Sequence, residues 1–584
     1  MNEAPSDEEL FVAHLATLSS RVSSALAHCG FERLVIHSGT PRYAFLDDQT
    51  YPFRVNPHFK WWLPLLDAPD CLLQIEPGRQ PILVFHSAAD YWHKPASLPS
   101  GSWARQFELR PVASWAATRA ALPEPDAHTA FIGEPFEGLA ELHFAAVNPE
   151  ALLRRLHEQR VRKTPYELMC LREASRSGAL GHRAAHRAYA DGGSEYAIHQ
   201  AFLAGCGLRE QELPYQAIVA RGANGATLHY QDLERDTRTS APSLLIDAGS
   251  QYRGYASDIT RSYTTDEGDF AALLAAMEDV QQSLCAAVRP GIDWRDLHLT
   301  AHRLVAEVLR DQGIIRSDPA DAVESGLSSV FLPHGLGHLL GLQVHDVAGF
   351  APSPDDPPVP PPAGHASLRL TRVLEPGFVV TMEPGLYFID LLLEAARSGA
   401  HAGAIDWNRV ESLRRYGGIR IEDNLVVTAQ GHENLTRDAF AATAAKAPKR
   451  AKRSSDFLRE QVANFPQQDF LCRRRRRRRI GRGNRGLLQL VDALEREEQH
   501  EGDDDEIKDA LKKHAVLQHD GLAVRAGTDD RAHVTEVHAG ERHAERRHDD
   551  VFDERGDDLA EGRTDNHADG HVDDIALDGK FLEL

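Results

Sequence analysis

The sequence has few sulfur-containing residues and lacks the long apolar runs of a membrane protein. Its 584 residues include six cysteines and four methionines, and no two cysteines form a CxxC pair. This scatter argues against a disulfide framework and indicates reduced thiols in a cytoplasmic protein. No run of about 18 apolar residues occurs, so we expect no transmembrane helix. The acidic, polar first residues also lack the basic and apolar regions of a signal peptide.

Basic residues are too few to balance the acidic ones. Lysine and arginine total 65 against 87 aspartates and glutamates, which gives a formal net charge of −22. A strongly acidic chain binds nucleic acid or an anionic membrane surface poorly, so we expect neither as a partner. Hydrophobic residues make up 42% of the chain, which is enough for large cores.

The spacing of apolar residues predicts an α/β (α+β) protein whose first domain spans residues 1–155. An amphipathic helix is expected at about 8–30, because its apolar residues recur at helical spacing. Short apolar segments bounded by turn residues then predict buried strands at 34–37, 71–75 and 81–85.

The second predicted domain spans residues 156–446. A charged helical segment precedes Thr164 and Pro165, which are suited to cap a helix and to occupy its first position. We expect a long helix from there to about residue 190. Apolar strands alternate with helices beyond it, to about residue 427.

The composition changes again in residues 447–584. This segment contains no tryptophan and no tyrosine, and an unbroken arginine run at 473–479 is followed by acidic and histidine-rich stretches. Such a chain buries too little apolar surface to offset the entropy of ordering it. We predict a disordered tail that takes no part in catalysis.

Three histidines fall within twelve residues at His334, His338 and His345. Glycines interleave them in Pro333-His334-Gly335-Leu336-Gly337-His338. Glycine permits tight turns and close backbone approach, and a neutral imidazole binds metals or shuttles protons near pH 7. By itself this pattern fits a glycine-rich loop with hydrogen-bonded histidines equally well.

Four acidic residues sit in strand-like surroundings, at Asp247, Asp258, Glu383 and Glu422. A single one of them is readily explained as a salt-bridged strand residue. Four carboxylates together with His338 form a hard, oxygen-rich set, which suits Mn²⁺ better than a thiolate-rich zinc site. Their combined charge exceeds the need of one divalent ion, so we predict two ions that share carboxylates.

These motifs resemble the metal-dependent pita-bread peptidases, the family of methionine aminopeptidase, aminopeptidase P and prolidase, and most closely its bacterial prolidase branch. The resemblance covers about residues 8–440. It implies a creatinase-like N-terminal α/β domain and a pita-bread catalytic domain. The segments that carry it are Asp247-Ala248-Gly249, Ser257-Asp258-Ile259-Thr260-Arg261, Pro333-His334-Gly335-Leu336-Gly337-His338, Leu342-Gln343-Val344-His345-Asp346, Thr381-Met382-Glu383-Pro384-Gly385-Leu386-Tyr387 and Gly417-Gly418-Ile419-Arg420-Ile421-Glu422-Asp423-Asn424. In the N-terminal half, Phe45-Leu46-Asp47-Asp48, Tyr51-Pro52-Phe53, Asn56-Pro57 and Asp90-Tyr91-Trp92-His93 also resemble the prolidase branch.

The resemblance implies hydrolysis of Xaa-Pro dipeptides by a hydroxide held between two Mn²⁺ ions. Asp258 and Glu422 would bridge the ions, with Asp247 on one ion and His338 and Glu383 on the other. Glu383 would also carry the proton to the leaving proline nitrogen. His345 and His229 would stabilise the oxyanion, and His334 would line the proline side.

The resemblance also implies the substrate contacts. Arg369 matches the arginine that binds the free carboxylate of a dipeptide, and Arg420 is expected to support the metal site. Further pocket walls are Tyr215, Trp294, Val344 and Leu368. Relatives of this branch also hydrolyse organophosphate esters, which implies a side activity of the same kind.

Two alternatives remain open from the sequence. An aminopeptidase P would perform the same chemistry on longer peptides, and cleavage of Xaa-Pro-Xaa tripeptides would reveal it. A peptide-binding module without catalysis would bind no activating divalent ion. The resemblance further implies a homodimer in which the loop 47–53 reaches toward the partner's active site.

Overall fold

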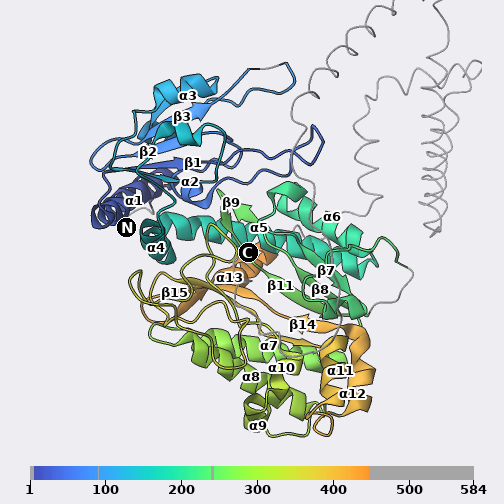
Figure 1. The fold of residues 1–584 in the computed structure, drawn as a ribbon. Coiled ribbons are helices and arrows are strands. Elements are labelled where there is room, and N and C mark those ends of the chain that lie inside the picture. Colours follow the sequence, from blue (N-terminus) through green and yellow to red (C-terminus); the bar gives the residue numbers. More distant parts are fainter. Residues whose placement is uncertain (1–4, 90, 238–241, 446–584) are drawn as a thin grey trace, which may run out of the picture. The chain divides into compact units, whose positions relative to one another are not determined.

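The computed structural model describes residues 5–89, 91–237 and 242–445 (Figure 1). The N-terminal part is built on a six-stranded mixed sheet with the order β4-β3-β2-β1-β5-β6. The central pairs β1–β2 and β2–β3 are antiparallel, whereas β3–β4, β1–β5 and β5–β6 are parallel. The strands are β1 (Arg33–His37), β2 (Leu72–Ile75), β3 (Ile82–His86), β4 (Glu108–Val112), β5 (Thr129–Ile132) and β6 (Ala146–Val147).

Helices cover this sheet. Helix α1 (Asp7–Cys29) begins in a capping box between Ser6 and Glu9 and ends at Gly30, whose φ of 76° favours glycine. Its length and composition alone would allow it to span a membrane. One of its faces, however, is buried in the hydrophobic core of the sheet together with α2 (Pro57–Trp62). The short α3 (Trp115–Ala121) contributes to a second, smaller cluster on the sheet. The predicted helix at 8–30 and the three predicted strands are confirmed.

Two helices lead into the second part of the chain, α4 (Glu150–Val161) and α5 (Pro165–Ala190). Thr164 caps α5 in a capping box with Glu167, and Pro165 occupies the first turn, as predicted. Helix α5 packs against α6 (Glu195–Cys206) and against α13 (Leu435–Ala445). The three helices lie on one side of the strands that carry the acidic residues (Figure 1).

These strands form several small antiparallel sheets. One has the order β11-β8-β7 and another β12-β15-β16, while β13 pairs with β14 and β9 with β10. A backbone bridge between Thr260 and Glu422 joins the first sheet to the β14–β15 segment. The strands are β7 (Ile218–Arg221), β8 (Ser243–Asp247), β9 (Gln251–Tyr252), β10 (Tyr255–Ala256), β11 (Thr260–Thr264), β12 (Val379–Met382), β13 (Gly385–Tyr387), β14 (Gly418–Arg420), β15 (Asp423–Val427) and β16 (His432–Asn434).

The largest hydrophobic cluster lies on the other side of these strands. Helix α8 packs against α7 and α9, and the aromatic side chains of Trp294, Phe331 and Phe378 are fully buried there. The helices are α7 (Asp269–Ala287), α8 (Trp294–Asp311), α9 (Pro319–Glu324), α10 (Leu327–Phe331), α11 (Asp390–Ser398) and α12 (Trp407–Leu413). Short 3-10 helices are η1 (Trp103–Gln106), η2 (Leu139–Leu142), η3 (Glu210–Glu212), η4 (Gly222–Ala226) and η5 (Arg414–Tyr416).

A buried ion network ties the α4–α5 junction to the histidine-rich loop. The carboxylate of Asp346 pairs with Arg160 through one oxygen and with Lys163 through the other, and Lys163 Nζ lies 2.9 Å from it. All three side chains are at most 2% exposed. A side chain at Gly341 would clash with this network, because its Cβ would lie 2.2 Å from Asp346 Oδ2.

The predicted tail at 447–584 lies outside the described residues. The predicted domain boundary near residue 155 also stays a prediction. The five cysteines in the described part of the chain are free, in agreement with the expectation of reduced thiols.

Candidate active site

Strand pairing brings three of the predicted acidic ligands together. Asp247 is the last residue of β8 and lies opposite Thr260 of β11, and Asp258 stands two residues before Thr260. The backbone N–H of Glu422 donates to the carbonyl of Thr260 at 3.0 Å. The Thr260 hydroxyl also donates to Glu422 Oε2 at 2.7 Å, which fixes that carboxylate beside the first two.

Glu383 faces Glu422 across an antiparallel ladder. The pairing runs from Val379 opposite Val426 to Met382 opposite Asp423, and it resumes with Gly385 opposite Arg420. Both stretches share one register, which places Glu383 and Glu422 opposite each other at the gap between them. Like charges in such a cross-strand pair repel, so this arrangement favours a cation between them.

His338 is anchored through its backbone to the same ladder. Its N–H donates to Thr381 Oγ1 at 3.1 Å, and its carbonyl accepts from the Thr381 N–H at 3.0 Å. Gly337 allows this approach, because a Cβ there would lie 2.2 Å from the Thr381 carbonyl oxygen. The ring Nδ1 lies 2.9 Å from the carbonyl oxygen of Leu339 and serves as the donor. Nε2 lies 3.4 Å from Asp258 Oδ2 and 3.6 Å from Glu383 Oε1, so a metal ion among these atoms would take its lone pair in place of a proton.

The carboxylates of this cluster are buried close together, so their ionised forms are unfavourable unless cations lie between them. Burial and neighbouring carboxylates raise the pKa of Glu422 well above its ordinary value, and burial raises the pKa of Glu383 to about 7. Burial likewise raises the pKa of Asp247. Burial alone would also raise the pKa of Asp258, but hydrogen bonding to His338 brings it below its ordinary value. Divalent ions would relieve this repulsion, and Asp258, His338 and Glu422 offer ligand atoms within 4.8 Å of one another. The residues present therefore fit a divalent metal centre.

Tyr215 and Arg420 hold the aspartates in place. The Tyr215 hydroxyl lies 2.7 Å from Asp247 Oδ1 and 2.6 Å from Asp258 Oδ1, so one phenolic proton serves both carboxylates. Arg420 donates from Nη2 to Asp247 Oδ2 at 2.7 Å. The sequence placed Tyr215 in a pocket wall, and the structure adds its contact with the proposed metal ligands.

A cavity of about 480 Å³ contains the cluster. It is lined by all five predicted metal ligands and also by most of the other predicted site residues, namely His229, His334, His345, Arg369, Arg420, Tyr215 and Val344. Trp294 and Leu368 are not among the residues that line it. Trp294 is fully buried at the start of α8, and Leu368 is buried behind Gly335.

The sequence reasoning gave no role to Tyr387. Its hydroxyl lies 2.8 Å from His334 Nε2 and accepts from Arg420 Nη1 at 2.8 Å. A chain of hydrogen bonds thus runs from His334 through Tyr387 and Arg420 to Asp247. Tyr387 ends the motif that begins at Thr381 and carries part of the family resemblance, but its place in that motif alone does not predict the contact.

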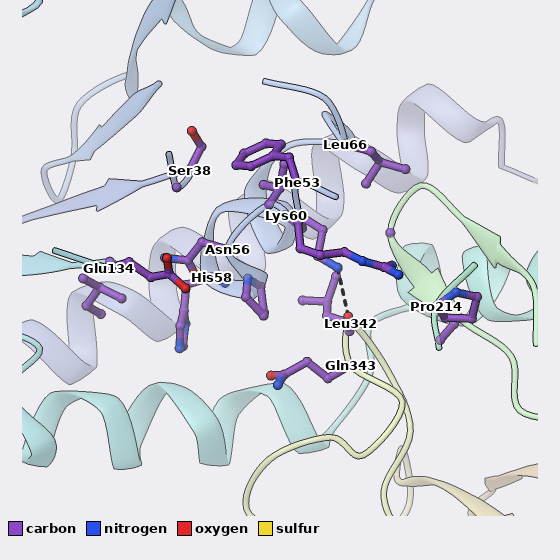
Figure 2. A pocket seen from close by; sticks show the side chains of 18 of the residues that line it. Ser38, Phe53, Asn56, His58, Lys60, Leu66, Glu134, Pro214, Leu342 and Gln343 are labelled. Carbon is purple, nitrogen blue, oxygen red and sulfur yellow. Dashed lines mark hydrogen bonds between the residues drawn. The ribbon is translucent and has the colours of Figure 1, made fainter. Parts of the chain in front are cut away.

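A second cavity of about 780 Å³ lies beside the first, and Val344 lines both. Figure 2 shows Lys60 reaching across it to donate to the carbonyl of Leu342, at 3.1 Å. The walls come from the N-terminal part, from residues 211–214, from the β9–β10 hairpin and from the loop after His338. None of the predicted metal ligands lines this larger cavity.

Comparison with known proteins agrees with this geometry. Residues 9–157 match the N-terminal domain of Xaa-Pro dipeptidases, and residues 169–429 match metallopeptidase family M24. The chain belongs to metallopeptidase family M24. Within the M24 family it falls in the bacterial prolidase branch, because similar proteins include the Xaa-Pro dipeptidases of Stenotrophomonas maltophilia and Xanthomonas axonopodis. These are 47% and 46% identical over 74% and 75% of this chain, and over 98% and 99% of their own lengths.

Solved structures of M24 enzymes have the same fold. An Escherichia coli aminopeptidase P with substituted zinc is 23% identical and has a TM-score of 0.56, over 76% of this chain and all of that chain. A proline aminopeptidase P II from Yersinia pestis is 25% identical with a TM-score of 0.54, over 74% of this chain and 99% of that chain. The predicted combination of a creatinase-like domain and a pita-bread catalytic domain is thereby confirmed.

Proposed function

We propose that this site hydrolyses Xaa-Pro dipeptides with two Mn²⁺ ions held by Asp247, Asp258, His338, Glu383 and Glu422. Membership of the prolidase branch already makes the chain a metal-dependent Xaa-Pro dipeptidase. The observation that carries the finer proposal is the convergence of all five ligands in one cavity with the histidines and Arg369. Carboxylate oxygens with one imidazole suit Mn²⁺. Two ions are proposed because four carboxylates carry more charge than one divalent ion balances.

The metal ions would supply Lewis acidity and a water molecule deprotonated near neutral pH. The protein residues would then position the substrate and move its protons. Glu383 would take a proton from the attacking water and deliver it to the proline nitrogen as the C–N bond breaks. His345 and His229 line the same cavity and would donate hydrogen bonds to the developing oxyanion. Burial lowers the pKa of His345 to about 3, so a neutral imidazole would make this contact.

Arg369 would bind the free carboxylate of the dipeptide. It lines the cavity, and within the described residues its side chain has no hydrogen-bond or ion-pair partner. An arginine that is not engaged elsewhere can offer both arms of its guanidinium to a carboxylate. His334, at the end of the chain of hydrogen bonds through Tyr387, would line the proline side.

Replacing Arg369 with alanine should raise KM for Gly-Pro and Leu-Pro by about ten- to a hundred-fold, since hydrogen bonds to charged groups contribute about 1.5–3 kcal/mol. Steady-state kinetics on a neutral phosphotriester provides the internal control, because that substrate has no carboxylate. Arg316→Ala, which removes an exposed arginine paired with Asp406, is the matched variant. An equal loss on both substrates would refute the assigned role.

Aminopeptidase P activity is the second candidate, favoured only by the likeness in fold. Assays of Gly-Pro, Leu-Pro and Xaa-Pro-Xaa tripeptides with and without Mn²⁺ distinguish the two. Preference for the dipeptides and dependence on Mn²⁺ would support the proposal, whereas faster cleavage of the tripeptides would favour aminopeptidase P. Turnover of a phosphotriester in the same assay tests the organophosphate side activity.

We also propose a cytoplasmic homodimer. The loop around 40–53 exposes large apolar side chains, with Phe45 88% and Leu46 91% accessible. Tyr43 and Tyr51 are exposed on the same loop. Exposed apolar groups gathered on one loop favour a partner surface. A monomeric mass by light scattering at micromolar concentration would contradict the dimer.

A further inference from the structure

A second group of metal-binding side chains lies outside the active-site cavity. Within the described residues, two groups of at least three such side chains bring their ligand atoms within 4.8 Å of one another. One consists of Asp258, His338 and Glu422. The other consists of His298, His302 and His365, which we call the histidine trio. None of the trio lines either of the two cavities described above.

The fold holds the trio from two directions. His298 and His302 are four residues apart on α8 and therefore lie on the same face of the helix. His365 approaches from the loop before β12, and its Nδ1 lies 3.0 Å from His298 Nε2. The three rings are 4.4–4.7 Å apart between centroids.

The hydrogen bond of His302 leaves its other ring nitrogen available for a ligand. His302 Nδ1 lies 2.9 Å from Ser328 Oγ, while its Nε2 is buried and has no hydrogen-bond partner. A ring whose Nδ1–H donates to a fixed acceptor presents the Nε2 lone pair, as in most protein metal sites. His302 is 1% exposed, so its unpartnered Nε2 is costly unless a ligand meets it.

The imidazoles are also in the protonation state that a metal requires. Burial and the neighbouring histidines lower the pKa of His298 to about 2 and that of His302 to about 3. Burial lowers the pKa of His365 as well. The rings are thus neutral at physiological pH, so no imidazolium has to lose a proton. The one N–H between His298 and His365 would move to the other nitrogen of its ring when an ion binds.

We propose that the histidine trio is a second metal site, which binds Zn²⁺ in preference to Mn²⁺. Three imidazoles form a nitrogen-only set that suits Zn²⁺, whereas the carboxylate-rich cluster in the active site suits Mn²⁺. Zn–N bonds of about 2.0–2.1 Å place bound nitrogens about 3.4 Å apart. The pair His298–His365 is already close to that spacing, and His302 needs to approach by no more than about 1.5 Å.

Such an ion would brace the loop that carries Arg369. The N–H of Leu368 donates to the carbonyl of His365 at 3.1 Å, so His365 and Arg369 flank a single turn. Ser367 Oγ also donates to the Pro333 carbonyl at 2.9 Å, next to His334. This positioning effect rests on the proposed function of Arg369, whereas zinc binding itself does not depend on it.

Zinc retention by the full-length, Mn²⁺-saturated protein tests the site. Wild type and the variants His302→Gln and His365→Gln are dialysed against buffered micromolar Zn²⁺ with Mn²⁺ in excess, and bound zinc is measured by mass spectrometry. His199→Gln is the matched control, because His199 is likewise buried on a helix with an unpartnered ring nitrogen. Zinc bound elsewhere on the chain is common to all four proteins and cancels in the comparison.

Wild type and His199→Gln should each retain about one zinc per chain more than the two trio variants, and zinc should raise their thermal midpoint but not that of the variants. His365 is 9% exposed and less buried than His302, so we expect the protein to tolerate its replacement more readily. The test therefore stays valid if His302→Gln does not fold. Equal zinc content in all folded proteins would overturn the proposal. A variant of an active-site metal ligand should lose dipeptidase activity but retain the zinc of the histidine trio. That result would show that the two sites bind metal independently.

Discussion

Glu422→Gln is expected to abolish nearly all turnover of Xaa-Pro dipeptides while leaving the fold intact. Loss of an outer-shell partner typically reduces metal affinity or activity about 10- to 100-fold, so losing a bridging carboxylate should cost more. The amide is nearly isosteric and can still accept from the Thr260 hydroxyl. Metal titration by calorimetry and kinetics at saturating Mn²⁺ measure the effect. Asp258→Asn should behave alike, and Glu411→Gln, at an exposed position on α12, is the control.

Glu422→Gln should lower activity but should not lower the stability of the metal-free protein. The pKa of Glu422 in the folded protein lies well above its ordinary value of 4.5, chiefly because of burial. Ionising this carboxyl therefore costs stability, and the metal-free protein becomes less stable as the pH rises above about 4.5. Glu422→Gln removes that cost, so without metal its thermal midpoint at pH 7 should equal or exceed that of wild type.

For the activity prediction, near-normal turnover of Glu422→Gln at saturating Mn²⁺ would refute the assignment of Glu422 as a ligand.

Asp346→Asn is expected to cause the largest loss of stability, about 3–5 kcal/mol. The substitution leaves Arg160 and Lys163 buried without their counter-ion. Burial alone would raise the pKa of Asp346, but Arg160 and Lys163 hold it at about 2. Because this value lies below the ordinary 3.8, the contribution is complete above about pH 4 and is lost as the pH falls toward 2.

Urea unfolding at pH 7 and between pH 4 and 2 measures this contribution. The difference between wild type and Asp346→Asn should be full at pH 7 and shrink in the acid range. Asp355→Asn, which breaks an exposed pair with Arg155, should leave the urea midpoint nearly unchanged. A midpoint for Asp346→Asn equal to that of the control would show that the buried network adds no stability. His345 adjoins Asp346, so the variant should also lose activity.

The sequence predicted the elements of the site better than their contacts. Asp247 ends an apolar strand and Glu383 follows another, and both patterns are visible locally because an acid interrupts a buried run. The contact of Thr260 with Glu422 spans 162 residues and depends on how separate strands pair. The double contact of Tyr215 likewise follows from tertiary packing, which no local spacing encodes.

The histidine trio shows the same limit. The spacing of His298 and His302 is a recognisable helical metal pattern, but their third partner lies 67 residues from His298. Trp294 and Leu368 were predicted as pocket walls by resemblance alone, and the structure places both outside the lining of the cavity. The spacing of residues along the chain predicts which faces are buried, whereas cavity lining depends on how loops fold over those faces.

The continuous ladder that places Glu383 opposite Glu422 has a consequence for how this chain can change in length. Residues 379–387 and 418–426 keep one register from end to end, and the N–H of Phe388 donates to the carbonyl of Gly417 at 2.9 Å, which extends this register by one pair. Adding or removing one residue within the ladder would turn a glutamate to the opposite face of the strand pair and dismantle the metal centre. Residues 389–416, which include α11 and α12, lie outside the ladder, so we expect a change of length there to leave both glutamates in register. We therefore expect changes of chain length to be tolerated in the connection and not within the ladder.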